Sequence, residues 1–171
     1  FSGDATVNLA SGKGISPNVT TTTDGQGTLN FLGDGAVTGQ VGDEYHYLKE
    51  IHVVQNGYAI DFNNTVYVNT LNFDDAAGSD TTVTFYNDAY IGQYGEGDGI
   101  TTGSDEYGVV NFQANAVVNG NVGTESDEAF RYTINANGGS GTLVDFQGDV
   151  CPYYLNFGGD GEVRIGGLAW I

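Results

Sequence analysis

The chain has 171 residues, enough for one compact domain with a hydrophobic core. Its 22 acidic residues against 4 Lys and Arg give a net charge of −18, which excludes nucleic acid and anionic membranes as favourable partners because both would repel it. With 39% hydrophobic and 12% aromatic residues, the composition is that of a folded protein and not of a disordered acidic chain.

Apolar residues alternate with polar or small residues along the whole chain. This period of two, built from β-branched and aromatic residues, predicts short strands with one buried face. The nearest approach to a helix, residues 43–51, is too short and is flanked by glycine, so we expect an all-β protein. The predicted strands centre on Val7/Leu9, Leu29/Phe31, Ile51/Val53, Ile60/Phe62, Val66/Val68, Leu71/Phe73, Val83/Phe85, Val110/Phe112, Tyr132/Ile134, Val144/Phe146, Leu155/Phe157 and Val163/Ile165.

The sequence repeats itself. Residues 27–42 (GTLNFLGDGAVTGQVG) return as residues 108–123 (GVVNFQANAVVNGNVG), and residues 57–73 return in weaker form as residues 141–157. The identical positions are mostly turn glycines and alternating apolar residues, with Asn30 as the polar one, and this pattern describes a scaffold. We therefore expect a single domain over 1–171, made of two related units of about 1–80 and 81–171.

The distance between equivalent strands favours one topology. Phe31 precedes Val53 by 22 residues, and Phe112 precedes Ile134 by 22 residues as well. A period of this size, with short strands and Gly/Asp-rich corners, predicts a parallel β-helix of roughly seven or eight rungs. The alternative is an antiparallel β-sandwich or jelly roll.

These stretches resemble the passenger domains of Gram-negative autotransporters, particularly the rickettsial-type surface antigens. The family's repeats read GTVTF-x-G-x-x-x-V-x-G-x-V-G, followed by an LxxI step and a V-x-x-LNF step. The matching stretches are residues 27–42, LKEIHV (48–53), VYVNTLNF (66–73), residues 108–123 and YYLNF (153–157). The resemblance implies a secreted right-handed β-helix, adhesive or architectural, located outside the cell or on the surface of a Gram-negative bacterium. One departure is that no translocator barrel follows GEVRIGGLAWI; a complete mature chain would then be a released passenger or an independent subunit, and the alternative is an excerpt of a longer helix.

Catalytic residues are not indicated. His46 and His52 lie close in sequence, but no G-x-S-x-G elbow accompanies them and their spacing is not that of metal ligands. Adjacent carboxylates would point to opposite faces of a strand or stand at solvated corners. These pairs are Asp74/Asp75, Asp105/Glu106 and Asp127/Glu128. We expect a protein that is not an enzyme and has no catalytic site.

Calcium, bound at acidic, glycine-rich turns, is the cofactor that the sequence offers as an alternative. Asp98, Asp105 and Glu106 could bring carboxylate and carbonyl oxygens together, which calcium prefers. Neither an EF-hand loop nor a complete calcium-binding nonapeptide is present, so we expect no cofactor and keep calcium as the alternative. Cys151 has no second cysteine to pair with and is either a free thiol or a core residue.

Both ends of the chain carry strand-like sequence, DATVNL (4–9) and GEVRIGGLAWI (161–171). Exposed strand edges recruit further strands, so a homo-oligomer or head-to-tail fibre is expected, with a host or matrix surface as a further partner. No stretch is apolar for long enough to insert into a membrane.

The predicted function is a non-enzymatic extracellular structural or adhesive surface protein. The alternative is a polysaccharide-binding or polysaccharide-cleaving β-helix. That alternative requires exposed aromatics such as Tyr45, Tyr47, Tyr90 and Tyr94 to line one groove with facing carboxylates.

Overall fold

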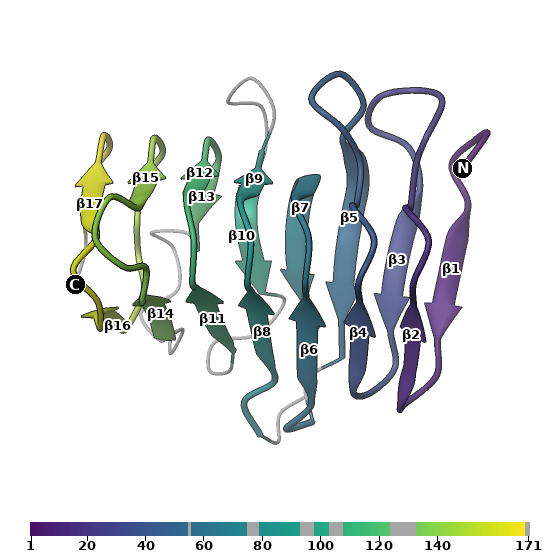
Figure 1. Cartoon of the computed structure of the whole chain (residues 1–171), viewed down its shortest axis with the longest axis horizontal. Coiled ribbons are helices and arrows are strands. Elements are labelled where there is room, and N and C mark those ends of the chain that lie inside the picture. The colour runs from purple at the N-terminus through teal and green to yellow at the C-terminus, as the bar shows by residue number, and fades with distance from the viewer. Residues whose placement is uncertain (55, 75–78, 93–97, 103–107, 124–132, 170–171) are drawn as a thin grey trace.

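The molecule is a parallel β-solenoid, seen in a computed structural model as short strands stacked along one long axis (Figure 1). The structure describes residues 1–54, 56–74, 79–92, 98–102, 108–123 and 133–169. This part of the chain contains no helix, and the ladders that join its strands are parallel. The predicted parallel β-helix is therefore confirmed, and the alternative antiparallel sandwich is wrong.

Each turn of the chain visits three faces in the same order, which we call faces 1, 2 and 3. Face 1 consists of β1 (Thr6–Leu9), β3 (Thr28–Phe31), β5 (Leu48–Val53), the second part of β7 (Val66–Phe73), β10 (Asp98–Thr102) and β13 (Asn121–Val122). Face 2 consists of β2 (Lys13–Ile15), β4 (Gly35–Val37), β6 (Ala59–Phe62), β8 (Thr82–Phe85), β11 (Val109–Phe112), β14 (Thr133–Ala136) and β16 (Tyr154–Phe157).

Face 3 begins with single bridges at Val19 and Val41 and becomes regular from the first part of β7 onward. Its further strands are β9 (Ala89–Ile91), β12 (Ala116–Val118), β15 (Leu143–Phe146) and β17 (Glu162–Ile165). Because β7 runs without a break from face 3 onto face 1, these two faces form one ten-stranded sheet. Face 2 is a separate seven-stranded sheet.

The solenoid makes about six turns between the first and the last strand of face 2, so this face carries seven rungs, within the seven or eight that the spacing predicted. The length of a turn varies along the chain. Asn8 and Asn30, which are hydrogen-bonded on neighbouring turns, are 22 residues apart, whereas Asn72 and Thr101 are separated by 29. The middle turns therefore use more residues than the early spacing suggests.

As the alternation predicted, every second side chain along these strands is apolar and points into the coil. In both β3 and β11 the second and fourth residues are buried and the first and third are half-buried. Five phenylalanine rings form a continuous row along the interior, with neighbouring centroids 5.2 to 6.3 Å apart. They are Phe31, Phe62, Phe85, Phe112 and Phe146. Each fully buried side chain of this kind contributes about 1.5–3 kcal/mol, so this shared interior holds the turns together.

The repeated sequence keeps its local structure but changes face. Residues 27–42 form a strand on face 1, a strand on face 2 and a bridge on face 3. Residues 108–123 form the same three steps beginning on face 2. Phe31 and Phe112 are thus equivalent within their motif but lie in different sheets. The pair 57–73 and 141–157 is displaced by one face in the same direction.

Two of the repeated glycines are required by the corners they form. Gly42 and its repeat partner Gly123 have φ angles of 65° and 74°, a left-handed conformation that other residues rarely adopt. A Cβ atom on Gly42 would also lie 2.5 Å from the backbone oxygen of Tyr67 on the next turn. The last glycine of the motif is therefore conformationally necessary in both copies.

Candidate functional site

Outward-facing asparagines on face 2 form a column that links successive turns. Asn111 donates a hydrogen bond to the hydroxyl of Thr84 (3.2 Å), and Asn135 donates to the side-chain oxygen of Asn111 (2.7 Å). Asn156 then donates to Asn135 at 2.8 Å. Asn111 and Asn135 each donate to the preceding turn and accept from the following turn, and Asn156 ends the column as a donor. These polar side chains therefore hold the turns in register.

Face 1 carries a similar column with one break. Asn30 donates a hydrogen bond to Asn8 (2.8 Å). On the following turn the position that pairs with Asn30 is His52, whose Nδ1 atom lies 3.2 Å from a carboxylate oxygen of Glu50. The side-chain oxygen of Asn30 is consequently buried without a hydrogen-bond partner among the described residues. The column resumes at His52, because the side-chain amide nitrogen of Asn72 lies 3.2 Å from the same ring nitrogen of His52. Asn72 also donates to Glu50 and accepts from Thr101. The column is therefore broken only between Asn30 and His52.

Corner side chains form a third set of contacts between turns. Asp34 accepts a hydrogen bond from the backbone N–H of Ala59 (2.8 Å), and among the described residues eight contacts of this kind, this one included, join a corner to the next turn. The accepting residues are Asn18, Asp24, Asp34, Asp80, Asp88, Asn115, Asn121 and Asp149. These N–H groups lie where the strand ladders are interrupted, so the acidic corners satisfy backbone donors as well as carrying charge.

The two histidines do not form a common site. His46 contacts Asp43 through its Nδ1 atom at 3.1 Å, whereas His52 pairs with Glu50 on another part of the turn. Within the described ranges no group of three or more His, Cys, Asp or Glu side chains could hold a metal ion. Asp74 ends a described stretch, while Asp75, Asp105, Glu106, Asp127 and Glu128 lie outside the described residues. Asp98 opens β10, but its side chain is likewise outside them.

A tyrosine stack lies on the outer side of face 3. The rings of Tyr67 and Tyr90 are parallel, with centroids 4.7 Å apart, and Tyr47 meets Tyr67 edge-on at 5.4 Å. Burial is the main cause that raises the pKa of Tyr67, with neighbouring negative groups adding to it. The packed rings therefore link neighbouring turns, a role that hydrogen bonds play in the asparagine columns.

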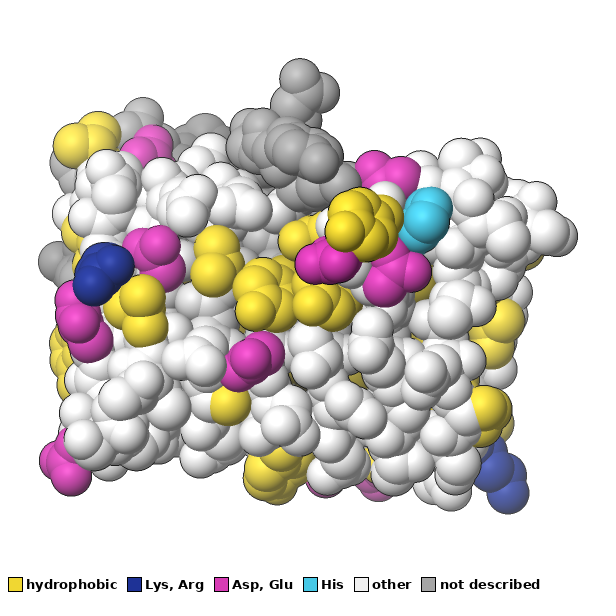
Figure 2. Space-filling model, turned by 45° about the horizontal axis from the view of Figure 1, so that its top comes forward, with side chains coloured by type: hydrophobic (Ala, Val, Ile, Leu, Met, Phe, Trp, Pro, Cys, Tyr) yellow, Lys and Arg dark blue, Asp and Glu magenta, His cyan; other side chains and the backbone are white. Residues whose placement is uncertain are grey.

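The loop beside the stack is acidic. Asp43 accepts from the backbone N–H groups of Tyr45 and His46, both at 2.9 Å. The Tyr45 N–H is the main cause that lowers the pKa of Asp43. Tyr45 is 72% exposed, whereas Tyr47 is buried and Tyr94 lies outside the described residues. Figure 2 shows hydrophobic and acidic side chains next to each other on one side of the molecule.

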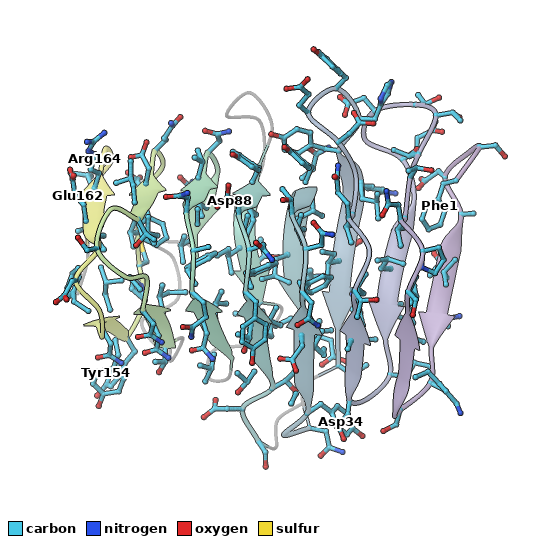
Figure 3. The ribbon with its side chains drawn as sticks, in the orientation of Figure 1. Phe1, Asp34, Asp88, Tyr154, Glu162 and Arg164 are labelled. Atoms are coloured by element: carbon cyan, nitrogen blue, oxygen red, sulfur yellow. The ribbon has the colours of Figure 1, made fainter. Side chains whose placement is uncertain are left out.

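The two ends of the solenoid differ. At the first end, Phe1 donates from its amino group to Thr20, and its carbonyl accepts from the N–H of Thr22 at 2.9 Å. A hollow of about 420 Å³ remains there, lined mainly by the apolar side chains of Phe1, Val7, Ile15, Val19 and Leu29. Figure 3 places Phe1 at this end and Tyr154, Glu162 and Arg164 at the other.

The second end is more apolar at its surface. Phe157 is 64% exposed and Leu168 is 57% exposed, and the centroids of the half-exposed Tyr153 and Tyr154 rings are 4.6 Å apart. β16 and β17 each end their sheets, so one edge of both strands is unpaired in the described part of the chain. Cys151, in contrast, is buried, in agreement with a core role.

No family model, curated protein or solved structure matches the chain. The likeness to autotransporter passengers therefore remains a prediction from the sequence. Among the described residues there is also no helix with the length and hydropathy that crossing a bilayer requires.

Sequence reasoning missed the side-chain columns and the accepting corners. The signal for the columns was the Asn-Phe pair at Asn30, Asn72, Asn111 and Asn156, in which Phe points inward and Asn outward. The corner acceptors had a weaker signal, because Asp and Asn are common at any turn.

Proposed function

We propose that this protein is a non-enzymatic structural or adhesive element of a bacterial surface. The observation that supports it most directly is the use of its polar side chains. Asn135, Asp34 and Tyr67 each contact the neighbouring turn, and none of the described groups converges on a metal or a reacting atom. A rod built in this way offers shape and stiffness.

The sequence resemblance and the charge support the same proposal. The passenger-like motifs lie on the strands and corners of a solenoid, which is the architecture that such surface antigens are expected to share. A net charge of −18 keeps a rod soluble and separate from anionic membranes. An extracellular location belongs to this proposal.

Adhesion can be tested with the purified chain immobilised on beads. Binding to a panel of matrix proteins, epithelial cells and abiotic surfaces is measured against beads that carry an unrelated acidic protein of similar charge. Saturable binding to one class of surface is expected. Steady release of shorter products from any of a panel of polysaccharides would contradict the non-enzymatic assignment.

A polysaccharide-binding role remains the alternative, and it would use Tyr45 with Asp43 and Glu44. Tyr45 is the aromatic residue of that loop with the most exposed ring. A glycan array probed with the parent chain and with Tyr45→Ala separates the two functions. Glycan binding that the substitution abolishes would favour the alternative, whereas binding to protein or cell surfaces that Tyr45→Ala leaves intact favours the structural role.

A further inference from the structure

The outward column of face 3 differs in chemistry from the outward columns of faces 1 and 2. Paired residues on successive turns place Tyr67, Tyr90 and Val117 in this column, and all three are half-buried. The outward columns of the other two faces include asparagines that link the turns by hydrogen bonds. Because asparagine can hold the turns in register, the aromatic residues of face 3 are not required for register alone.

Carboxylates from two separate corners surround the tyrosine stack. Burial is the largest cause that raises the pKa of Tyr67. After the neighbouring Tyr90, the further causes are the negative charges of three carboxylates, Glu44, Asp88 and Asp43. Glu44 and Asp43 belong to the loop that precedes β5, whereas Asp88 directly precedes β9, and Figure 3 places Asp88 away from both ends of the solenoid. The negative charges therefore meet on the side of the rod.

No Lys or Arg side chain neutralises these carboxylates in the part of the chain that the structure describes. Lys49 pairs with Asp4 at 2.8 Å, and Arg164 pairs with Glu162 at 2.7 Å. Lys13 belongs to face 2. Figure 2 shows apolar side chains at the surface with acidic side chains directly beside them. An apolar patch with a charged rim is typical of an interaction site, and here the charge complementary to the rim is positive.

Tyr45 supplies the exposed aromatic ring of this surface. It is 72% exposed, and its backbone N–H is held by Asp43 at 2.9 Å. The Glu44 carboxylate beside its hydroxyl group is the main cause that raises the pKa of Tyr45. A guanidinium group that lies on this ring would contact an aromatic face and a carboxylate together. Arginine suits such a position because its cation is planar, weakly hydrated and able to stack on aromatic rings.

We propose that the surface formed by Tyr45, Glu44, Asp88 and the tyrosine stack binds an arginine-rich segment of another protein. One arginine stacks on Tyr45 and pairs with Glu44, and the segment continues along the stack toward Asp88. The net charge of −18 draws a basic partner toward the rod. This inference goes beyond the proposed function and does not rest on it, because adhesion through another face would survive its failure.

Fluorescence anisotropy of a labelled oligo-arginine peptide, titrated with the whole chain at about 0.15 M salt, tests the inference. The parent chain should bind saturably, and the same peptide with citrulline in place of arginine should bind much more weakly. Tyr45→Ala and Glu44→Gln should each weaken binding about two- to fivefold. Tyr45→Phe keeps the aromatic ring and should bind as the parent does. Asp61→Asn is the matched control, because it removes one negative charge from face 2, and it should leave the affinity nearly unchanged.

Circular dichroism verifies that every variant is folded. The inference is wrong if the arginine peptide shows no saturable binding up to about 1 mM protein, which corresponds to a very weak contact. It is also wrong if Tyr45→Ala binds as tightly as the parent chain. Equal losses from Asp61→Asn and Glu44→Gln would show that net charge alone attracts the peptide. Equal binding of the citrulline peptide would show that the surface does not recognise a cation.

Discussion

Replacing His52 with Asn should stabilise the protein by completing the face 1 column. Asn30 has a buried side-chain oxygen without a described partner, and His52 occupies the position from which the next turn would donate to it. In the face 2 column, donors always come from the later turn. An Asn at position 52 would donate to Asn30 in that direction and accept from Asn72.

The expected gain follows from these contacts. A new net hydrogen bond to Asn30 contributes about 0.5–1.5 kcal/mol, and the loss of the His52–Glu50 contact, whose side chains are 28% and 24% exposed, removes about 0–1 kcal/mol. The bond from Asn72 to the new asparagine replaces the present contact between Asn72 and His52. Asn72 keeps its bond to Glu50, because its amide has two hydrogens. We expect a net stabilisation of about 0.5 kcal/mol, which raises the midpoint of thermal unfolding by roughly 1–2 °C in a chain of this length.

Urea and thermal unfolding of the parent chain, His52→Asn and His52→Ala measure this effect. The alanine variant also removes the imidazole, but it leaves Asn30 without a partner, so it isolates the contribution of the column. Equal stability of the asparagine and alanine variants would refute the reasoning, whatever their stability relative to the parent.

Three other changes test the remaining contacts. Asn135→Ala removes one donor and one acceptor from the face 2 column and should cost about 1–3 kcal/mol in urea unfolding, while substitution of the exposed Asn156 at the end of the column should cost less. Phe85→Ala empties the middle of the phenylalanine row and should cost about 3–5 kcal/mol; a cost below 1 kcal/mol would show that the row is not packed as described. Asp43 has a lowered pKa in the folded state, so its contribution is present at neutral pH and is lost as the pH falls below the ordinary aspartate value of about 3.9. Asp43→Asn should therefore flatten the decline of stability between about pH 5 and pH 2, and an unchanged decline would contradict the assignment.

The sequence predicted the interior well because alternation and turn length are local properties. Leu29 and Phe31 are both fully buried, and Phe31 pairs with Val53 on the next turn as their 22-residue spacing indicated. The spacing of the first turns could not predict the longer turns between Asn72 and Thr101.

The candidate sites were less predictable, since they depend on which residues the stacking brings together. Asn30 and His52 are far apart in sequence, and only the pairing of β3 with β5 makes one the missing partner of the other. Composition indicated acidic corners but did not indicate that Asp34 accepts from the next turn.

The displacement of the repeat by one face has a consequence for how such chains can grow. A strand that packs equally well on any of the three sides tolerates gene duplications that are not a whole number of windings, because the copied segment simply starts on the adjacent side. Successive copies then point their identical outer residues in different directions around the axis. A rod lengthened in this way would present one recognition surface to several neighbours at once.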